Sequence, residues 1–268
     1  MCRARGLLFY AIIIDMLSRN QIIEYLKNFA FSKDYVFAMW LEGADGLNKV
    51  DEYSDIDFWF DVKKEHQESF LYECIDELQK LGEIDSRVDD IREEIAQSNI
   101  HLANTSEYLT LDICVQSHEI RGLDLTCFTR NDLAERPLVL FDKNNIITFR
   151  DASKLDTEDL QKTFDNSKNR ILQSSRITKY IKRNQYGEAY LKYIENIANP
   201  LVIIARIIYT PNHLDYGLCH INDHLPQKIV QELEQFYKVA SFEDIKNNVA
   251  KAKELLEKLE QQFTKKYF

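Results

Sequence analysis

Residues 40–62, WLEGADGLNKVDEYSDIDFWFDV, contain a glycine turn, a polar stretch of chain, and a segment in which aspartates alternate with large apolar residues. This alternation predicts a β-strand with one buried face. Positions two apart on a strand point to the same side, so Asp55 and Asp57 share the other face, and Asp61 continues the row. Neighbouring carboxylates repel one another unless a cation lies between them, so the stretch predicts a Mg²⁺ site. A half-exposed edge strand with acidic outward positions is the alternative.

A second apolar stretch, YLTLDICVQ at residues 108–116, carries a lone aspartate, Asp112. Burying an aspartate among apolar neighbours is unfavourable unless it is hydrogen-bonded or bound to a metal. If this strand lies near the first, three aspartates would form a platform able to hold two Mg²⁺ ions, an arrangement suited to in-line displacement at phosphorus. A hydrogen-bonded aspartate at a strand end is the alternative for Asp112.

Composition limits the classes of partner. The 268 residues, 45% of them hydrophobic, suit one large domain or two ordinary ones. A net charge of −10 argues against binding to nucleic acid or to an anionic membrane, because both need a surplus of lysine and arginine. The five cysteines are scattered and form no Cys-x-x-Cys pair, so neither a disulfide framework nor a cysteine zinc site is indicated. A reducing cytoplasm fits best.

The first residues resemble part of a signal peptide, since two arginines precede an apolar run at residues 7–14. The run is too short to span a bilayer, and no small-x-small cleavage site follows it. Met16 opens a segment in which Ser18 can cap a helix. We therefore expect translation to start at Met16, with residues 1–15 as an upstream extension.

The spacing of apolar residues predicts an α+β fold whose character changes near residue 151. Residues 16–150 read as a mixed sheet with helices, and residues 151–268 as an α-helical bundle in which Pro200 marks a kink or break. The elements expected in the first part are helices at 18–31 and 64–82, the second ending at Gly82, and strands at 35–43, 55–62, 98–104, 108–116 and 144–151. An acidic connection is expected between the second helix and residue 98.

The stretch LEGADGLNKVDEYSDIDFWF resembles the signature of the nucleotidyltransferase superfamily, in which a strand ends in Gly-Ser or Gly-Gly and an Asp-x-Asp strand follows about a dozen residues later. Gly43 takes the glycine position, Asp55 and Asp57 the doublet, and Asp112 falls where a third carboxylate strand is expected. The layout, a sheet domain followed by helices, is similar to the aminoglycoside and streptomycin adenylyltransferases and their uncharacterised relatives.

The resemblance implies a mechanism and its residues. Asp55 and Asp57 would hold two Mg²⁺ ions, with Asp112 as a further ligand or as the base that takes a proton from an acceptor hydroxyl. The nucleotide would be bound by Gly43, Ala44, Ser54 and, from the basic segment KYIKR, Lys179. A nucleoside monophosphate, AMP from ATP or its equivalent from another nucleoside triphosphate, would pass to a small and possibly cationic acceptor such as an aminoglycoside. Glu188 and Glu195 are alternative bases.

One position departs from the family pattern. Ala44 stands where the family has a serine, so a hydroxyl that would bind a phosphate is absent. Losing one such hydrogen bond to a charged oxygen costs about 1.5–3 kcal/mol. A catalytically weak or inactive relative, acting as a nucleotide-binding, antitoxin-like or partner-binding module, is therefore the alternative to an enzyme.

Other metal and sugar sites fit less well. An EF-hand loop starting at Asp51 is excluded, because its sixth position is Ile56 and its twelfth is Val62. A glycosyltransferase normally has an extended nucleotide-binding half before its Asp-x-Asp, and here only one helix and about one strand precede it. The segment CHINDH at residues 219–224 could grip zinc, but a packed helix end is favoured because Pro226 follows.

Overall fold

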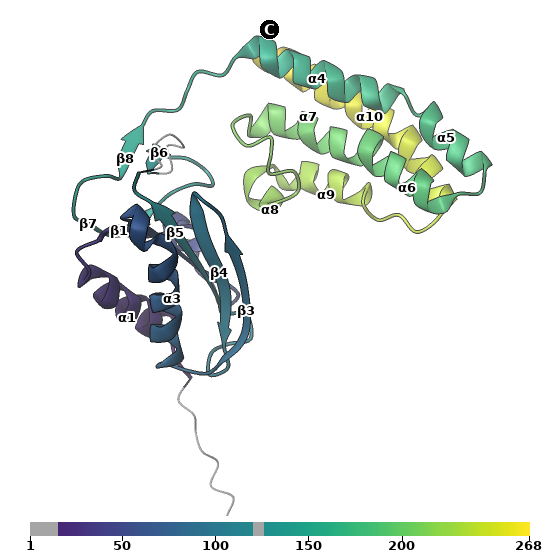
Figure 1. Cartoon of the computed structure of the whole chain (residues 1–268). Coiled ribbons are helices and arrows are strands. Elements are labelled where there is room, and N and C mark those ends of the chain that lie inside the picture. The colour runs from purple at the N-terminus through teal and green to yellow at the C-terminus, as the bar shows by residue number, and fades with distance from the viewer. Residues whose placement is uncertain (1–15, 120–125) are drawn as a thin grey trace, which may run out of the picture. The chain divides into compact units, whose positions relative to one another are not determined.

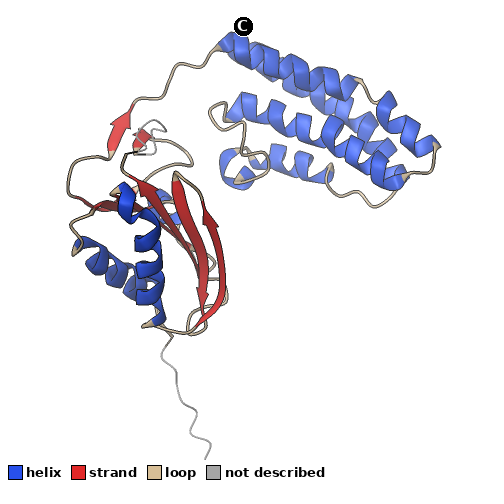
Figure 2. Cartoon of the chain, in the orientation of Figure 1, coloured by secondary structure: helices blue, strands red, loops and turns tan. Residues whose placement is uncertain are grey.

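The computed structural model describes residues 16–119 and 126–268, so the expected upstream extension at residues 1–15 lies outside the described residues. The chain divides into two compact units, the first ending at Ala152 and the second running from Ser153 to Phe268. Figure 1 shows a sheet with helices in the first unit and a group of helices in the second. The predicted α+β class, a mixed sheet followed by helices, is therefore confirmed (Figure 2).

A six-stranded sheet forms the body of the first unit, in the order β3-β4-β5-β2-β1-β7. Its strands are β1 (Val36–Leu41), β2 (Ile56–Val62), β3 (Ile84–Ile91), β4 (Ile95–Leu102), β5 (Thr110–Ser117) and β7 (Leu138–Asp142). β2 and β5 pair in parallel, whereas the other neighbours pair antiparallel. The two strands that carry the predicted aspartates are thus neighbours at the centre of the sheet.

Two helices, α1 (Arg19–Phe31) and α3 (Gln67–Gln79), cover one face of this sheet (Figure 1). Ile56, Phe58 and Phe60 of β2 are fully buried in the core between sheet and helices. The alternation predicted for β2 is confirmed, and it directs the intervening positions to the opposite face of the sheet. The apolar core therefore fixes which side chains are left for chemistry.

The start of α1 follows the sequence prediction. Ser18 is the N-cap residue. The backbone N–H and the hydroxyl of Ser18 donate to the side-chain oxygen of Gln21, at 2.8 Å and 2.7 Å. This arrangement satisfies donors that would otherwise lack a partner at the helix end. The first residue inside the helix is Arg19, whose side chain reaches the site described below.

A second, two-stranded sheet pairs β6 (Cys127–Thr129) with β8 (Thr148–Arg150) in parallel. The strand predicted at 144–151 is therefore shorter than expected and lies outside the main sheet. Phe128 of β6 packs edge-on against Trp40 of β1, with ring centroids 6.3 Å apart. Neither β6 nor β7 was predicted, because both are short and β7 is half-exposed, which leaves little apolar alternation in their sequences.

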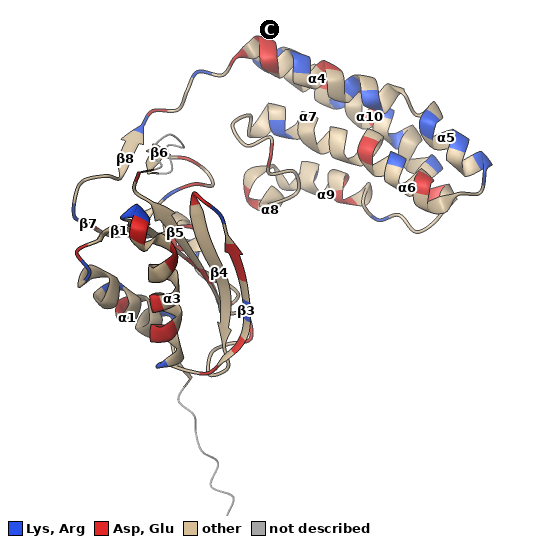
Figure 3. Cartoon of the chain, viewed as in Figure 1, with Lys and Arg blue, Asp and Glu red and all other residues tan. Residues whose placement is uncertain are grey.

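The prediction of an acidic connection before residue 98 is wrong. That stretch forms β3 and the beginning of β4, and acidic residues are visible along β3 in Figure 3. β3 is an edge strand in which nearly every residue is exposed, so its sequence has no apolar face to reveal it. Charged edge strands resist pairing with other chains, which gives these acidic residues a structural purpose.

The predicted helix at 64–82 is also shorter than expected. It begins with a 3₁₀ turn at Lys64–His66, and α3 ends at Gln79 rather than at Gly82. A Cβ atom on Gly82 would lie 2.0 Å from Oδ1 of Asn104. Glycine is therefore needed there for the close approach of two loops, not to terminate the helix.

The second unit is helical, as predicted. Its helices are α4 (Thr157–Leu172), α5 (Ser175–Lys182), α6 (Tyr186–Tyr193), α7 (Asn199–Tyr209), α8 (Ile221–His224), α9 (Gln227–Gln235) and α10 (Phe242–Tyr267). A π-helical segment, Ile194–Ala198, joins α6 to α7 and places Pro200 in the first turn of α7. The helical backbone runs without a break from α6 through the π-helical segment into α7, and the π-helical turn ends two residues before Pro200, the residue that lacks an N–H. Among the helices of the described ranges, none combines the length and apolar character needed to cross a membrane.

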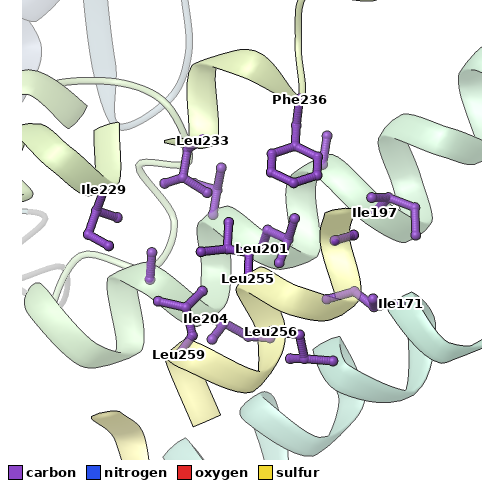
Figure 4. Close-up of a cluster of buried hydrophobic side chains, with 14 of the residues drawn as sticks. Ile171, Ile197, Leu201, Ile204, Ile229, Leu233, Phe236, Leu255, Leu256 and Leu259 are labelled. Atoms are coloured by element: carbon purple, nitrogen blue, oxygen red, sulfur yellow. The ribbon is translucent and has the colours of Figure 1, made fainter. Parts of the chain in front are cut away.

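A continuous apolar core holds these helices together (Figure 4). Leu201 and Ile204 of α7 meet Leu255 and Leu259 of α10, and all four are almost completely buried. Such burial stabilises each side chain by about 1.5–3 kcal/mol relative to exposure. The second unit therefore has a hydrophobic core of its own.

We expect Leu26→Ala to lower the free energy of unfolding of the first unit by about 2–5 kcal/mol, because it leaves a cavity beneath α1. Leu26 is 0% exposed, whereas Leu133 of the same unit is 51% exposed. Leu133→Ala is the matched control, expected to change stability by no more than about 0.5 kcal/mol. Both tryptophans, Trp40 and Trp59, belong to the first unit, so urea titration followed by tryptophan fluorescence reports that unit. Equal effects of the two changes would contradict the packing of α1 on the sheet.

Candidate active site

The structure brings the three predicted aspartates together at one end of the parallel strand pair. Asp57 on β2 and Asp112 on β5 are directly opposite each other in the ladder, and adjacent strands lie only about 4.8 Å apart. Both side chains are half-buried on the face opposite the helices, and Asp55 is exposed just before β2 begins. Asp55, Asp57 and Asp112 therefore form a cluster in space, called the carboxylate cluster below.

These carboxylates lack full compensation for their charge. Burial raises the pKa of Asp57 to about 6, and repulsion from Asp55, Asp112 and Asp45 adds to the effect. Burial also raises the pKa of Asp112, against the opposing effect of Gln97, whose amide nitrogen lies 2.8 Å from each carboxylate oxygen. A cation placed among these groups would remove the repulsion.

The glycine turn lies directly against the carboxylate cluster. Gly43 has φ of +55°, and a Cβ atom there would lie 2.0 Å from Oδ2 of Asp57. It begins the short helix α2 (Gly43–Leu47), and the backbone N–H of Glu42 donates to the carbonyl of Asp57 at 3.1 Å. A glycine is required here both by the backbone conformation and by the closeness of the carboxylate.

Ala44 and Ser54 flank the cluster in the chain. Ala44 is half-buried in α2, next to Gly43. The hydroxyl of Ser54 donates to the carboxylate of Asp51 at 2.8 Å and accepts from the Asp51 backbone N–H at 2.9 Å. Ser54 therefore closes a local turn ahead of β2, and its contact with a nucleotide stays a prediction.

The remaining predicted residues belong to the second unit. Lys179 lies on α5, with its ammonium 5.0 Å from the ring centre of Tyr180. Glu188 is on α6, and Glu195, in the π-helical segment, pairs with Lys192 at 2.6 Å. Their roles toward the nucleotide or acceptor stay predictions.

Two residues of the site were missed in the sequence. Glu42 is the single residue between β1 and α2. Nε1 of Trp40 donates to its carboxylate at 2.8 Å. Burial raises the pKa of Glu42 to about 7, with smaller contributions from Glu135 and Asp57 and an opposing one from Trp40. Its position immediately before Gly43 was the available signal.

The other missed residue is Arg19, which has no local signal in the sequence because it lies 36 residues before Asp55. Its guanidinium pairs with the carboxylate of Asp45 in α2 and donates to the carbonyls of Ser54, at 3.0 Å, and Asp55, at 2.5 Å. One cation thus joins the start of α1 to both chain segments that frame the carboxylate cluster.

Several other polar side chains do not join the site. Asp61 is on the same face of β2 as Asp57 but is only 2% exposed. Its carboxylate is hydrogen-bonded to Nε2 of Gln116 at 2.7 Å and to Nδ1 of His118 at 2.6 Å. His220 directly precedes the short helix α8 and His224 is its last residue, and their rings lie 5.7 Å apart. The interpretation of CHINDH as a packed helix end stays a prediction, since Ile221 is buried whereas Cys219 and His220 are exposed.

The donor set suits magnesium carried by a nucleotide. Within residues 16–119 and 126–268, no three His, Cys, Asp or Glu side chains gather closely enough to hold a metal ion by themselves. Mg²⁺ at nucleotide sites is typically bound by one or two carboxylates, and phosphate oxygens and water complete its shell. Asp57 and Asp112 supply oxygen donors from neighbouring strands, so the described residues fit that kind of binding better than a closed protein cage.

The chain is similar to several solved structures. No protein-family model matches the chain, and a search of curated proteins finds no match. The chain is similar to an aminoglycoside 6-adenyltransferase from Bacillus subtilis, with 14% identity, a TM-score of 0.39, and coverage of 93% of this chain and 91% of that one. It is also similar to a spectinomycin adenyltransferase from Enterococcus faecialis solved with ATP and spectinomycin, with 10% identity, a TM-score of 0.30, and coverage of 90% and 100%. A GLD-2/RNP-8 complex gives 10% identity, a TM-score of 0.29, and coverage of 83% and 65%.

We expect Asp57 to make the first unit less stable as pH rises in metal-free buffer. Its folded pKa of about 6 exceeds the ordinary 3.8, so the folded state binds more protons between these values and loses stability until pH passes about 6. Asp57→Asn should be more stable than the wild type at pH 7–8 and have a shallower pH dependence. Urea titrations with a chelator, followed by tryptophan fluorescence, measure this.

Asp89→Asn is the matched control with the opposite sign. The ion pair with Arg87 lowers the pKa of Asp89, so its contribution is present above pH 3.8 and is lost as pH falls. This variant should be less stable than the wild type at neutral pH. Destabilisation by both substitutions at pH 7–8 would contradict the uncompensated charge at Asp57.

Proposed function

We propose that this protein is a Mg²⁺-dependent nucleotidyltransferase, which transfers a nucleoside monophosphate to a hydroxyl group of a small acceptor and releases pyrophosphate. The observation that carries the proposal is the opposed pair Asp57 and Asp112, whose charge is only partly compensated and which lies beside the glycine turn at Gly43. A carboxylate pair next to a turn of backbone N–H groups suits a metal-bound polyphosphate. AMP from ATP is the leading donor group.

The roles of the residues follow from their positions. Asp55 and Asp57 would hold the metal, which supplies charge neutralisation at the phosphates when bound. Asp112 either binds a second ion or takes the proton of the acceptor hydroxyl, with Gln97 orienting its carboxylate. The hydroxyl oxygen forms a bond to the α-phosphorus, the bond from that phosphorus to the bridging oxygen breaks, and pyrophosphate leaves.

Further parts of the proposal rest on the sequence. Residues 16–150 would form the nucleotidyltransferase domain, and Lys179 of the helical domain at 151–268 would contact the phosphates. The net charge of −10 favours a cationic acceptor, of which an aminoglycoside-type antibiotic is the leading case. The scattered cysteines favour the cytoplasm.

A nucleotide-binding or regulatory relative is the second candidate. The observation that favours it is Ala44, which removes a phosphate-binding hydroxyl from the turn. Such a protein would bind a metal–nucleotide complex through the same carboxylates but would not turn it over.

Pyrophosphate release separates the two candidates. With Mg²⁺, each nucleoside triphosphate and a panel of aminoglycosides and other hydroxyl-bearing antibiotics, we expect release that depends on one acceptor. Asp57→Asn should reduce it roughly a hundredfold or more, because the metal loses a ligand where charge develops. Asp89→Asn, on the exposed edge strand, should retain activity. Nucleotide binding without release under any acceptor would favour the regulatory candidate, and neither binding nor release would contradict both.

Restoring the missing hydroxyl provides a second prediction. Ala44→Ser should tighten binding of the Mg²⁺–nucleotide complex by about 1.5–3 kcal/mol, or roughly 10- to 150-fold, because it supplies a donor to a charged oxygen. Ala103→Ser, at an exposed position in the same unit, is the control and should leave affinity unchanged. Calorimetric titration with a non-hydrolysable nucleotide gives both values. Equal affinities for all three proteins would mean that the α2 turn does not contact phosphate.

A further inference from the structure

Arg19 is held at the carboxylate cluster by several contacts. Its side chain is 16% exposed, and the carboxylate that it pairs with, Asp45, is 8% exposed. The Nη1 group donates to the carbonyls of both Ser54 and Asp55 and so fixes the guanidinium, whose planar fork is rigid, to the backbone. Its positive charge is therefore a permanent part of the site.

The charge of Arg19 acts on more than its direct partner. The guanidinium also donates to the backbone carbonyls of Ser54 and Asp55, so the charge lies against the carboxylate cluster as well as against Asp45. Arg19 thus offsets part of the negative charge at the cluster, and the remainder is left for a bound cation.

Arg19 also lies at the turn where the proposed function places the phosphates. Asp45, its ionic partner, directly follows Ala44, the residue that lacks the phosphate-binding hydroxyl. The Nε of Arg19 is buried and has no hydrogen-bond acceptor. Guanidinium groups bind phosphate oxygens through charge-assisted hydrogen bonds.

We propose that Arg19 is the resident counter-charge of this site and selects its ligand, disfavouring a bare divalent cation and favouring one that arrives with a polyphosphate. The proposal rests on the proposed function for the identity of the ligand. A fixed positive charge repels an incoming divalent ion. A triphosphate brings enough negative charge to reverse that interaction and contacts the guanidinium at the α2 turn.

This proposal gives effects of opposite sign for two ligands, which a merely structural role would not. Arg19→Met removes the charge, so bare Mn²⁺, a probe for Mg²⁺, should bind about threefold tighter or more. The same variant should bind Mn²⁺ with α,β-methylene ATP about tenfold more weakly or worse, because it loses a charged phosphate contact. Electron paramagnetic resonance of free Mn²⁺ and calorimetry measure the two affinities on the full chain.

Two further variants control for charge and folding. Arg19→Met with Asp45→Asn leaves the local net charge as in the wild type and no unpaired buried carboxylate, so Mn²⁺ affinity should return toward the wild-type value while nucleotide affinity stays low. Arg87→Met breaks a comparable arginine–carboxylate pair on the edge strand β3 and should change neither affinity. Tryptophan fluorescence establishes that each variant is folded before titration.

The outcomes separate this proposal from the proposed function. Weaker binding of both ligands by folded Arg19→Met would mean that Arg19 only shapes the site, and unchanged affinity for bare Mn²⁺ would equally overturn the proposal. A wild-type protein that binds Mn²⁺ but no nucleoside triphosphate would contradict the proposed function and with it the phosphate role of Arg19. The effect of Arg19→Met on bare Mn²⁺ would still decide whether Arg19 opposes the ion.

Discussion

The parallel pairing of β2 with β5 is the constraint on which the candidate site depends. Its register is fixed by burial, because Ile56 and Phe58 on β2 lie opposite Leu111 and Ile113 on β5, and all four are fully buried beneath α1 and α3. A slip of one residue would turn these apolar side chains away from the core. The same register sets Asp57 opposite Asp112. Hydrophobic burial on one face thus forces two carboxylates together on the other.

The resulting charge is offset in several ways, and none of them is complete. The amide of Gln97 stabilises the ionised form of Asp112, and Arg19 lies near enough to lower the pKa of Asp57. Even so, both carboxylates keep raised pKa values, since burial and repulsion from neighbouring aspartates prevail. The exposed carboxylate of Asp89 differs, because its pair with Arg87 lowers its pKa. Clustered carboxylates whose pKa values stay raised are typical of functional sites, and a bound cation would relieve their repulsion.

The sequence predicted those parts of the fold that have strong local patterns. The alternation in β2, the apolar spacing of α1 and the glycine turn are local signals, and the structure places each as expected. It did not predict β3, because an exposed edge strand has no buried face to reveal, nor the place of Arg19, because its contact with Asp55 spans 36 residues and depends on how α1 packs. Spacing placed Asp55 and Asp57 two residues apart at the start of β2, whereas the register that adds Asp112 arises only from tertiary packing.

The most direct test of the central claim is a crystal structure of the full chain with Mn²⁺ and α,β-methylene ATP, using the anomalous signal of the metal. The account predicts a metal peak within about 2.2 Å of a carboxylate oxygen of Asp57, with phosphate oxygens completing its shell and the nucleotide against the turn at Gly43. Nucleotide and metal bound elsewhere on the chain, with Asp57 and Asp112 contacting neither, would contradict it.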